Sequence, residues 1–117
     1  MQPPALVTFD CYGTLIDWNG GIVGALTAEG ERQGREAAAD AILAAYHRAE
    51  PRVQADAFRT YREVLTLLEA EVADELGWSP PQQPGYLAAS VPSWRPFADT
   101  NPALRGLAAA GLRLGIL

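Results

Sequence analysis

The chain has 117 residues, of which 49% are hydrophobic and 20% charged, as in a single small globular domain. Its formal net charge is −5 and its arginines are scattered, so the sequence offers no basic patch for nucleic acid or an anionic membrane. One cysteine excludes an internal disulfide framework and fits a reducing cytoplasm, and without paired Cys or His residues a structural zinc site is not expected. We also expect neither a secretion signal nor a membrane span.

The first expected element is a short strand over residues 5–9, ALVTF, which is apolar and β-branched. Such a run predicts a buried strand of a parallel sheet. Asp10 follows it directly, so its carboxylate is expected at the carboxyl edge of the sheet, where ligands bind in such folds. Gly13 permits the turn that leaves the strand.

The middle of the chain predicts helices. One begins near Asp17 or Asn19, and a second covers residues 37–50 and is ended or kinked by Pro51. The clearest is expected over 58–76, with Gly77 at its C-terminal cap and Glu69 on the polar side. Its expected apolar stripe consists of Phe58, Tyr61, Val64, Leu65, Leu68, Val72 and Leu76.

After a proline-rich break over residues 79–85, a short helix, a longer helix and a last strand are expected. Asn101 and Pro102 suit the start of the longer helix and Gly111 its end. Its expected buried face is formed by Leu104, Leu107 and Ala108. The order is thus strand, helical insert, helix, strand, which predicts an α/β fold with a helical lid after the first strand. Because a usual sheet has about five or six strands, we expect this chain to be a fragment.

Three stretches resemble one protein family: TFDCYGTLIDW at 8–18, FRTYREVL at 58–65, and VPSWRPFADTNPALRGLAAAGLRLGIL at 91–117. The whole chain resembles the N-terminal half of the haloacid dehalogenase superfamily, and most closely the type II (S)-2-haloacid dehalogenases. The resemblance implies a partial Rossmann-like core over residues 1–17 and 96–117, with two strands, and a helical cap over 18–95. The family's later serine, lysine and acidic motifs would follow the second strand, beyond this sequence.

By this resemblance Asp10 is the nucleophile, which would form an ester or acyl phosphate that water then hydrolyses. The position of Tyr12 separates two reactions. Phosphatases of the superfamily carry a second aspartate there, as a general acid for the alkoxide leaving group. A phenol is a poor acid at neutral pH, and a halide leaves without a proton, so Tyr12 favours dehalogenation and no obligatory Mg²⁺. The alternative is that Tyr12 is a packing aromatic in a relative with a different substrate.

The resemblance assigns further site residues. Thr14 would hydrogen-bond the nucleophile or substrate region, its alternative role being an ordinary turn hydroxyl. The backbone N–H groups of Cys11 and Tyr12 would receive the substrate carboxylate. The dehalogenases carry a cap arginine for the carboxylate and the halide. His47 falls at that position here with Arg48 beside it, so His47 is either a cationic substitute or a neutral packing or surface residue.

The sequence therefore predicts a cytoplasmic hydrolase that dehalogenates a small 2-halo acid through an aspartyl ester, without a cofactor. A Mg²⁺-dependent phosphatase of a small metabolite and a catalytically inactive fragment stay open as alternatives. The predicted partner is a small-molecule substrate, with neither nucleic acid nor membrane, and a homodimer of the full-length protein is left open.

Overall fold

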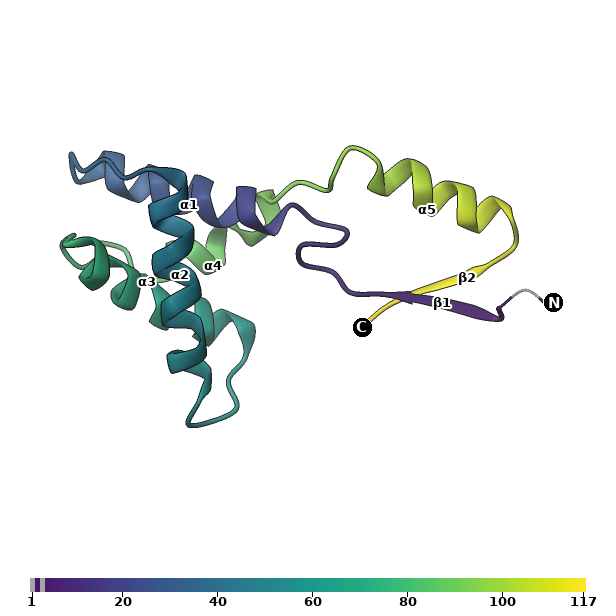
Figure 1. Cartoon of the computed structure of the whole chain (residues 1–117), viewed down its shortest axis with the longest axis horizontal. Helices are drawn as coiled ribbons and strands as arrows, with labels where there is room; N and C mark the ends of the chain where they lie inside the picture. The colour runs from purple at the N-terminus through teal and green to yellow at the C-terminus, as the bar shows by residue number, and fades with distance from the viewer. Residues whose placement is uncertain (1, 3) are drawn as a thin grey trace. The chain divides into compact units, whose positions relative to one another are not determined.

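The computed structural model describes residue 2 and residues 4–117. Within them two parallel strands near the termini flank five α-helices, which confirms the predicted α/β class (Figure 1). The chain forms two compact units. The first comprises the described residues up to Gly20 together with Trp94–Leu117, and the second is Gly21–Ser93. The role of the second unit as a cap stays a prediction. No helix in the described part of the chain is both long and apolar enough to cross a membrane.

The sheet of the first unit pairs β1 (Leu6–Phe9) in parallel with β2 (Arg113–Ile116). Leu6 lies opposite Arg113, and Phe9 opposite Ile116. The prediction of a buried first strand is wrong for this chain, because Leu6 is 50% exposed and Val7 and Phe9 are only half-buried. A parallel strand is fully buried only when neighbouring strands and helices cover both faces of its sheet.

The helix α5 (Thr100–Ala109) contacts β2. It begins one residue before the predicted cap Asn101, and the residue at its N-cap, Asp99, makes no side-chain capping bond. The expected buried face is also only partly buried: Leu104 and Leu107 are half-buried and Ala108 is exposed. Gly111, with a φ of +84°, provides the left-handed turn that leads into β2.

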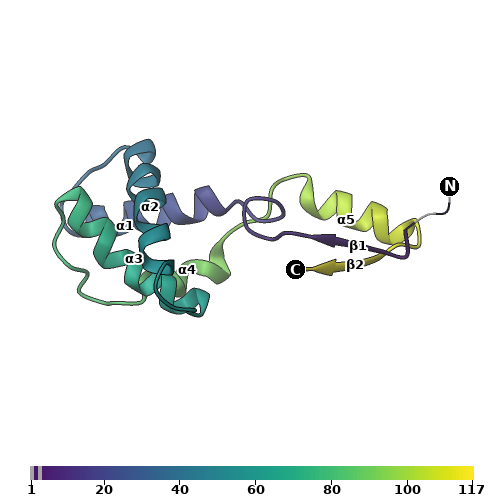
Figure 2. The same cartoon turned by 60° about the horizontal axis from the view of Figure 1, so that its bottom comes forward.

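The helix α1 (Trp18–Arg32) begins in the first unit and continues into the second, where α2 (Ala39–Gln54), α3 (Tyr61–Leu76), α4 (Tyr86–Ser90) and the 3₁₀ turn η1 (Val91–Ser93) follow. Asp17 accepts a hydrogen bond from the Gly20 N–H at 3.0 Å, as the predicted helix start requires. The helix α3 lies against both α2 and α4 (Figure 2). The largest fully buried apolar side chains of this unit are Tyr46, Ile22, Leu26, Ile42, Leu65, Leu68, Leu87 and Val72.

Three details of the helices differ from the sequence predictions. Pro51 does not end α2, because the helix continues to Gln54. Proline costs one hydrogen bond near a helix end, which neighbouring packing can offset. Phe58 is 97% exposed and precedes α3, which begins at Tyr61. Glu69, expected on the polar side, is 1% exposed and is buried within the unit.

Candidate active site

Asp10 is the first residue after β1 and is exposed. The carbonyl of Phe9, the last residue of β1, accepts a hydrogen bond from the Leu117 N–H at 2.9 Å, so the chain is paired up to the residue before Asp10. Thus the expected position of the carboxylate at the carboxyl end of a parallel strand is observed. A group placed there is supported by the sheet but open to a ligand.

The loop after Asp10 is a compact turn organised around one carbonyl. The oxygen of Cys11 accepts hydrogen bonds from the N–H groups of Thr14, Leu15 and Ile16 at 3.2, 2.8 and 3.1 Å. Gly13 has a φ of +80°, a left-handed conformation that suits glycine, and its N–H donates to the Ile16 carbonyl at 2.9 Å. The turn folds the chain back and brings the side chain at position 14 toward Asp10.

The two residues predicted to be catalytic are in direct contact. The hydroxyl of Thr14 donates to Oδ2 of Asp10 at 3.0 Å. A hydrogen bond to a carboxylate is stronger than one between neutral groups, and it restricts the rotation of the acceptor. The contact therefore orients an exposed carboxylate that would otherwise rotate freely.

Tyr12 packs beside this pair against an aromatic neighbour. Its ring lies edge-on to the Trp94 ring, with the centroids 5.9 Å apart and the planes at 75°. Trp94 is buried, whereas Tyr12 is 40% exposed. Cys11 is half-buried. Tyr12 thus packs against Trp94 and remains partly exposed.

Hydrogen bonds join this loop to residues 95–100, which lie much later in the sequence. The Asp17 N–H donates to the Arg95 carbonyl at 2.8 Å, and the Leu15 carbonyl accepts from both the Phe97 N–H at 3.2 Å and the Thr100 hydroxyl at 2.8 Å. Sequence reasoning missed Thr100, because its partner is 85 positions away and no local pattern connects the two. The one local signal for Thr100 is its place before Asn101 at a predicted helix start, where residues with a hydroxyl are common.

His47 and Arg48 lie on α2 in the second unit. His47 is exposed, and its ring lies edge-on to the Tyr46 ring, with the two ring centroids 6.0 Å apart. Arg48 donates through Nε to Glu75 of α3. His47 and Arg48 belong to the second unit and Asp10 to the first, and each unit is described by itself.

Among residues 2 and 4–117, no group of three or more His, Cys, Asp or Glu side chains is arranged to hold a metal ion. No protein-family model matches this chain, and no curated protein is significantly similar to it in sequence.

Proposed function

We propose that this chain carries the nucleophile of a cytoplasmic hydrolase that removes halide from a small 2-halo acid, in the manner of the haloacid dehalogenase superfamily. The observation that carries the proposal is the Asp10 carboxylate, exposed at the end of a parallel strand and oriented by the Thr14 hydroxyl at 3.0 Å. A carboxylate needs such exposure and orientation to attack an electrophilic carbon.

The reaction has two steps. A carboxylate oxygen of Asp10 attacks the carbon that bears the halogen, the new C–O bond forms with inversion, and the halide leaves with the bonding electron pair. Water then adds to the acyl carbon of the aspartyl ester. This releases the 2-hydroxy acid, restores the Asp10 carboxylate and yields one proton. The first step requires no proton transfer to the leaving group.

The identity of residue 12 supports halide over alkoxide as the leaving group. A phosphate monoester loses an alkoxide, which benefits from a general acid by about 10²–10⁴-fold. Tyr12 supplies no carboxylic acid, and its ring is packed against Trp94. The backbone N–H groups of Cys11 and Tyr12 are proposed to receive the substrate carboxylate. The role of His47 in substrate binding stays a prediction of the resemblance.

The test measures chloride release from (S)-2-chloropropionate by the full-length protein. Chloride release is expected from the wild type and from the control Asp40→Asn, which alters an exposed carboxylate on α2. Asp10→Asn should release none. In a single turnover in water labelled with heavy oxygen, the label should enter Asp10 rather than the product, because water attacks the acyl carbon.

Absence of chloride release above the Asp10→Asn level refutes the dehalogenase proposal. Phosphate release from phosphorylated metabolites that depends on Mg²⁺ and on Asp10 would establish the phosphatase alternative instead. If neither activity depends on Asp10, the chain has no role as a hydrolase of this superfamily.

A further inference from the structure

The first turn of α1 contains an asparagine followed by a glycine, Asn19 and Gly20, and both residues are exposed. The Gly20 N–H donates to Oδ1 of Asp17 at 3.0 Å, so the Asp17 carboxylate caps the helix. The first N–H groups of a helix have no carbonyl of a preceding turn to bind. The Gly20 amide therefore depends on this one side chain.

The cap itself requires glycine at position 20. A Cβ added to Gly20 would lie 2.4 Å from Oδ2 and 2.9 Å from Cγ of Asp17, which is too close for real atoms. A larger residue would fit only if the Asp17 carboxylate moved away and gave up its hydrogen bond. The cap thus places a residue without a side chain directly after an exposed asparagine.

An asparagine followed by glycine can become an aspartate without an enzyme. The backbone nitrogen of Gly20 gives its proton to hydroxide and attacks Cγ of Asn19, a C–N bond forms, and the side-chain amide leaves as ammonia. Water then opens the cyclic imide at either carbonyl, which yields aspartate or isoaspartate. The net reaction consumes water and releases ammonia. Glycine favours ring closure because no Cβ hinders it and its backbone rotates freely.

The folded first turn opposes this reaction. The Gly20 N–H is engaged with Asp17, so its proton is less available to hydroxide. In a helix each Cα–Cβ bond also tilts toward the N-terminus, which directs the Asn19 side chain away from the nitrogen that follows it. Ring closure therefore requires that the first turn opens and the Gly20 amide is released.

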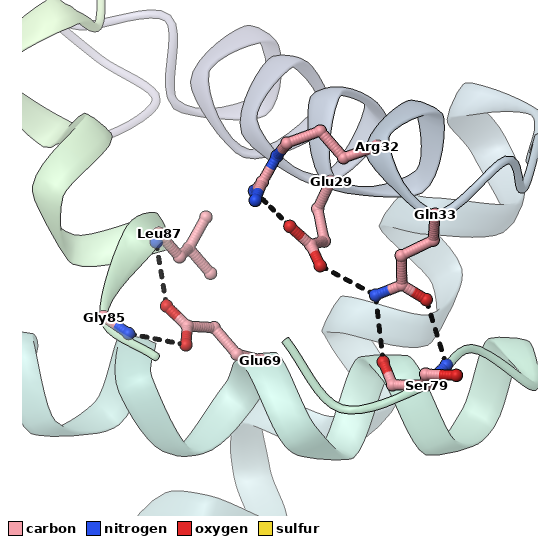
Figure 3. Close-up of polar contacts among 7 residues, drawn as sticks. All are labelled: Glu29, Arg32, Gln33, Glu69, Ser79, Gly85 and Leu87. Carbon is pink, nitrogen blue, oxygen red and sulfur yellow. Dashed lines mark hydrogen bonds and ion pairs between the residues drawn. The ribbon is translucent and has the colours of Figure 1, made fainter. Parts of the chain in front are cut away.

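The two ends of α1 are secured differently. Just after its C-terminal end, Gln33 donates to Glu29 at 2.7 Å and exchanges two hydrogen bonds of 3.0 Å with the backbone of Ser79 (Figure 3). Arg32 pairs with Glu29 at the same end (Figure 3). These contacts join α1 to the segment that follows α3. The Gly20 amide at the other end depends on one capping side chain, so local opening is expected to begin there.

We propose that Asn19 is a site of spontaneous deamidation and that the Asp17 cap sets its rate. Each event adds one negative charge to a chain whose net charge is −5. Aspartate in the first turn suits the dipole of α1. Isoaspartate instead routes the main chain through Cβ, and the added backbone atom disrupts the turn. This proposal is independent of the reaction at Asp10.

The protein is incubated in mildly alkaline buffer, and peptide mass mapping then separates the aspartyl from the isoaspartyl products. Asn101 is the internal reference, because the nitrogen of the following Pro102 carries no proton and cannot close the imide. Asn19 should lose its amide group, and Asn101 should not. Asp17→Ala should accelerate the loss at Asn19 about fivefold, the factor that corresponds to one capping hydrogen bond.

Asp17→Ser separates the hydrogen bond from the charge, because serine caps a helix without a carboxylate, and it should react at the wild-type rate. In concentrated urea the three proteins should share one faster rate, since no turn remains to be opened. The proposal is refuted if Asn19 in the folded protein is as inert as Asn101, or if Asp17→Ala reacts at the wild-type rate. It is also refuted if Asp17→Ser reacts as fast as Asp17→Ala, or if urea does not accelerate the wild type.

Discussion

The Thr14 hydroxyl contacts one oxygen of the Asp10 carboxylate. Both groups are exposed, so water competes for the same carboxylate and the bond contributes little to folding. Its effect is to hold the carboxylate in one orientation. For a nucleophile, orientation affects the rate of attack more than it affects stability.

Removal of the hydroxyl should therefore affect activity and not stability. We expect Thr14→Val to lower the rate of ester formation in the proposed reaction by about tenfold, the value of one hydrogen bond to a charged group. The thermal midpoint should remain that of the wild type. The control is Thr66→Val, which removes a hydroxyl that donates to the Arg62 carbonyl within α3 and should leave the rate unchanged. An unaltered rate in Thr14→Val would contradict the orienting role.

Arg48 forms an ion pair with a residue of the neighbouring helix. Its guanidinium pairs with Glu75 across α2 and α3, at a site where the arginine side chain is 58% exposed. We expect Arg48→Met to lower the free energy of unfolding by less than about 1 kcal/mol, an effect that shrinks as salt screens the pair. The KM for a 2-halo acid should not change. Urea titrations at low and high salt measure the change in the free energy of unfolding, with Arg105→Met on α5 as the control. A large rise in KM would instead support Arg48 as a substrate-binding residue.

At the scale of elements, the start of α3 is determined by a capping box and not by its apolar stripe. The Thr60 hydroxyl accepts the Glu63 N–H at 3.3 Å, and the Glu63 carboxylate accepts the Thr60 N–H at 2.7 Å. The T-x-x-E signal is present in the sequence, whereas the apolar periodicity extends the predicted helix back to Phe58. The local hydrogen bonds decide the boundary, because an exposed phenylalanine gains nothing from joining the helix.

We expect Thr60→Ala to destabilise the chain by about 1 kcal/mol at pH 7, as measured by urea unfolding. The hydrogen bond from Thr60 lowers the pKa of the Glu63 carboxyl. Because the pKa of Glu63 is lowered in the folded state, its hydrogen bonds stabilise the fold above pH 4.3, the ordinary glutamate value. This stabilisation is lost as the pH falls through the lowered pKa of Glu63. The difference between wild type and Thr60→Ala should therefore shrink in acid. A difference that is constant from pH 7 to pH 3 would exclude a role of Glu63 in the cap.

At the scale of the whole molecule, the two units differ in how well each buries its apolar residues. The second unit has a core of buried side chains from α1, α2, α3 and α4, whereas the first unit leaves Ile116 64% and Leu117 89% exposed. Buried apolar area is the main stabilising contribution in small domains. Most of the folding free energy of this chain is thus expected to reside in the helical unit.

Adjacent leucines on α3 test this distribution. Leu68 is fully buried and Leu67 is 44% exposed. We expect Leu68→Ala to cost about 2–5 kcal/mol, because it removes contacts and leaves a cavity, and Leu67→Ala to cost less than about 1 kcal/mol. Urea unfolding followed by far-ultraviolet circular dichroism measures both. Equal losses in the two variants would contradict a core between the helices.

Local patterns in the sequence determined the α/β class, the order of its elements, the glycine turns at Gly13, Gly77 and Gly111, and the place of Asp10 at a strand end. These features depend on backbone conformation and on hydrophobic periods over a few residues, which neighbouring residues suffice to define. Such patterns do not predict the burial of Glu69, the pairing of Arg48 with Glu75, or the hydrogen bond from Thr100 to the Leu15 carbonyl. Each of these joins residues far apart in sequence, and a polar side chain is buried only where such a distant partner satisfies it.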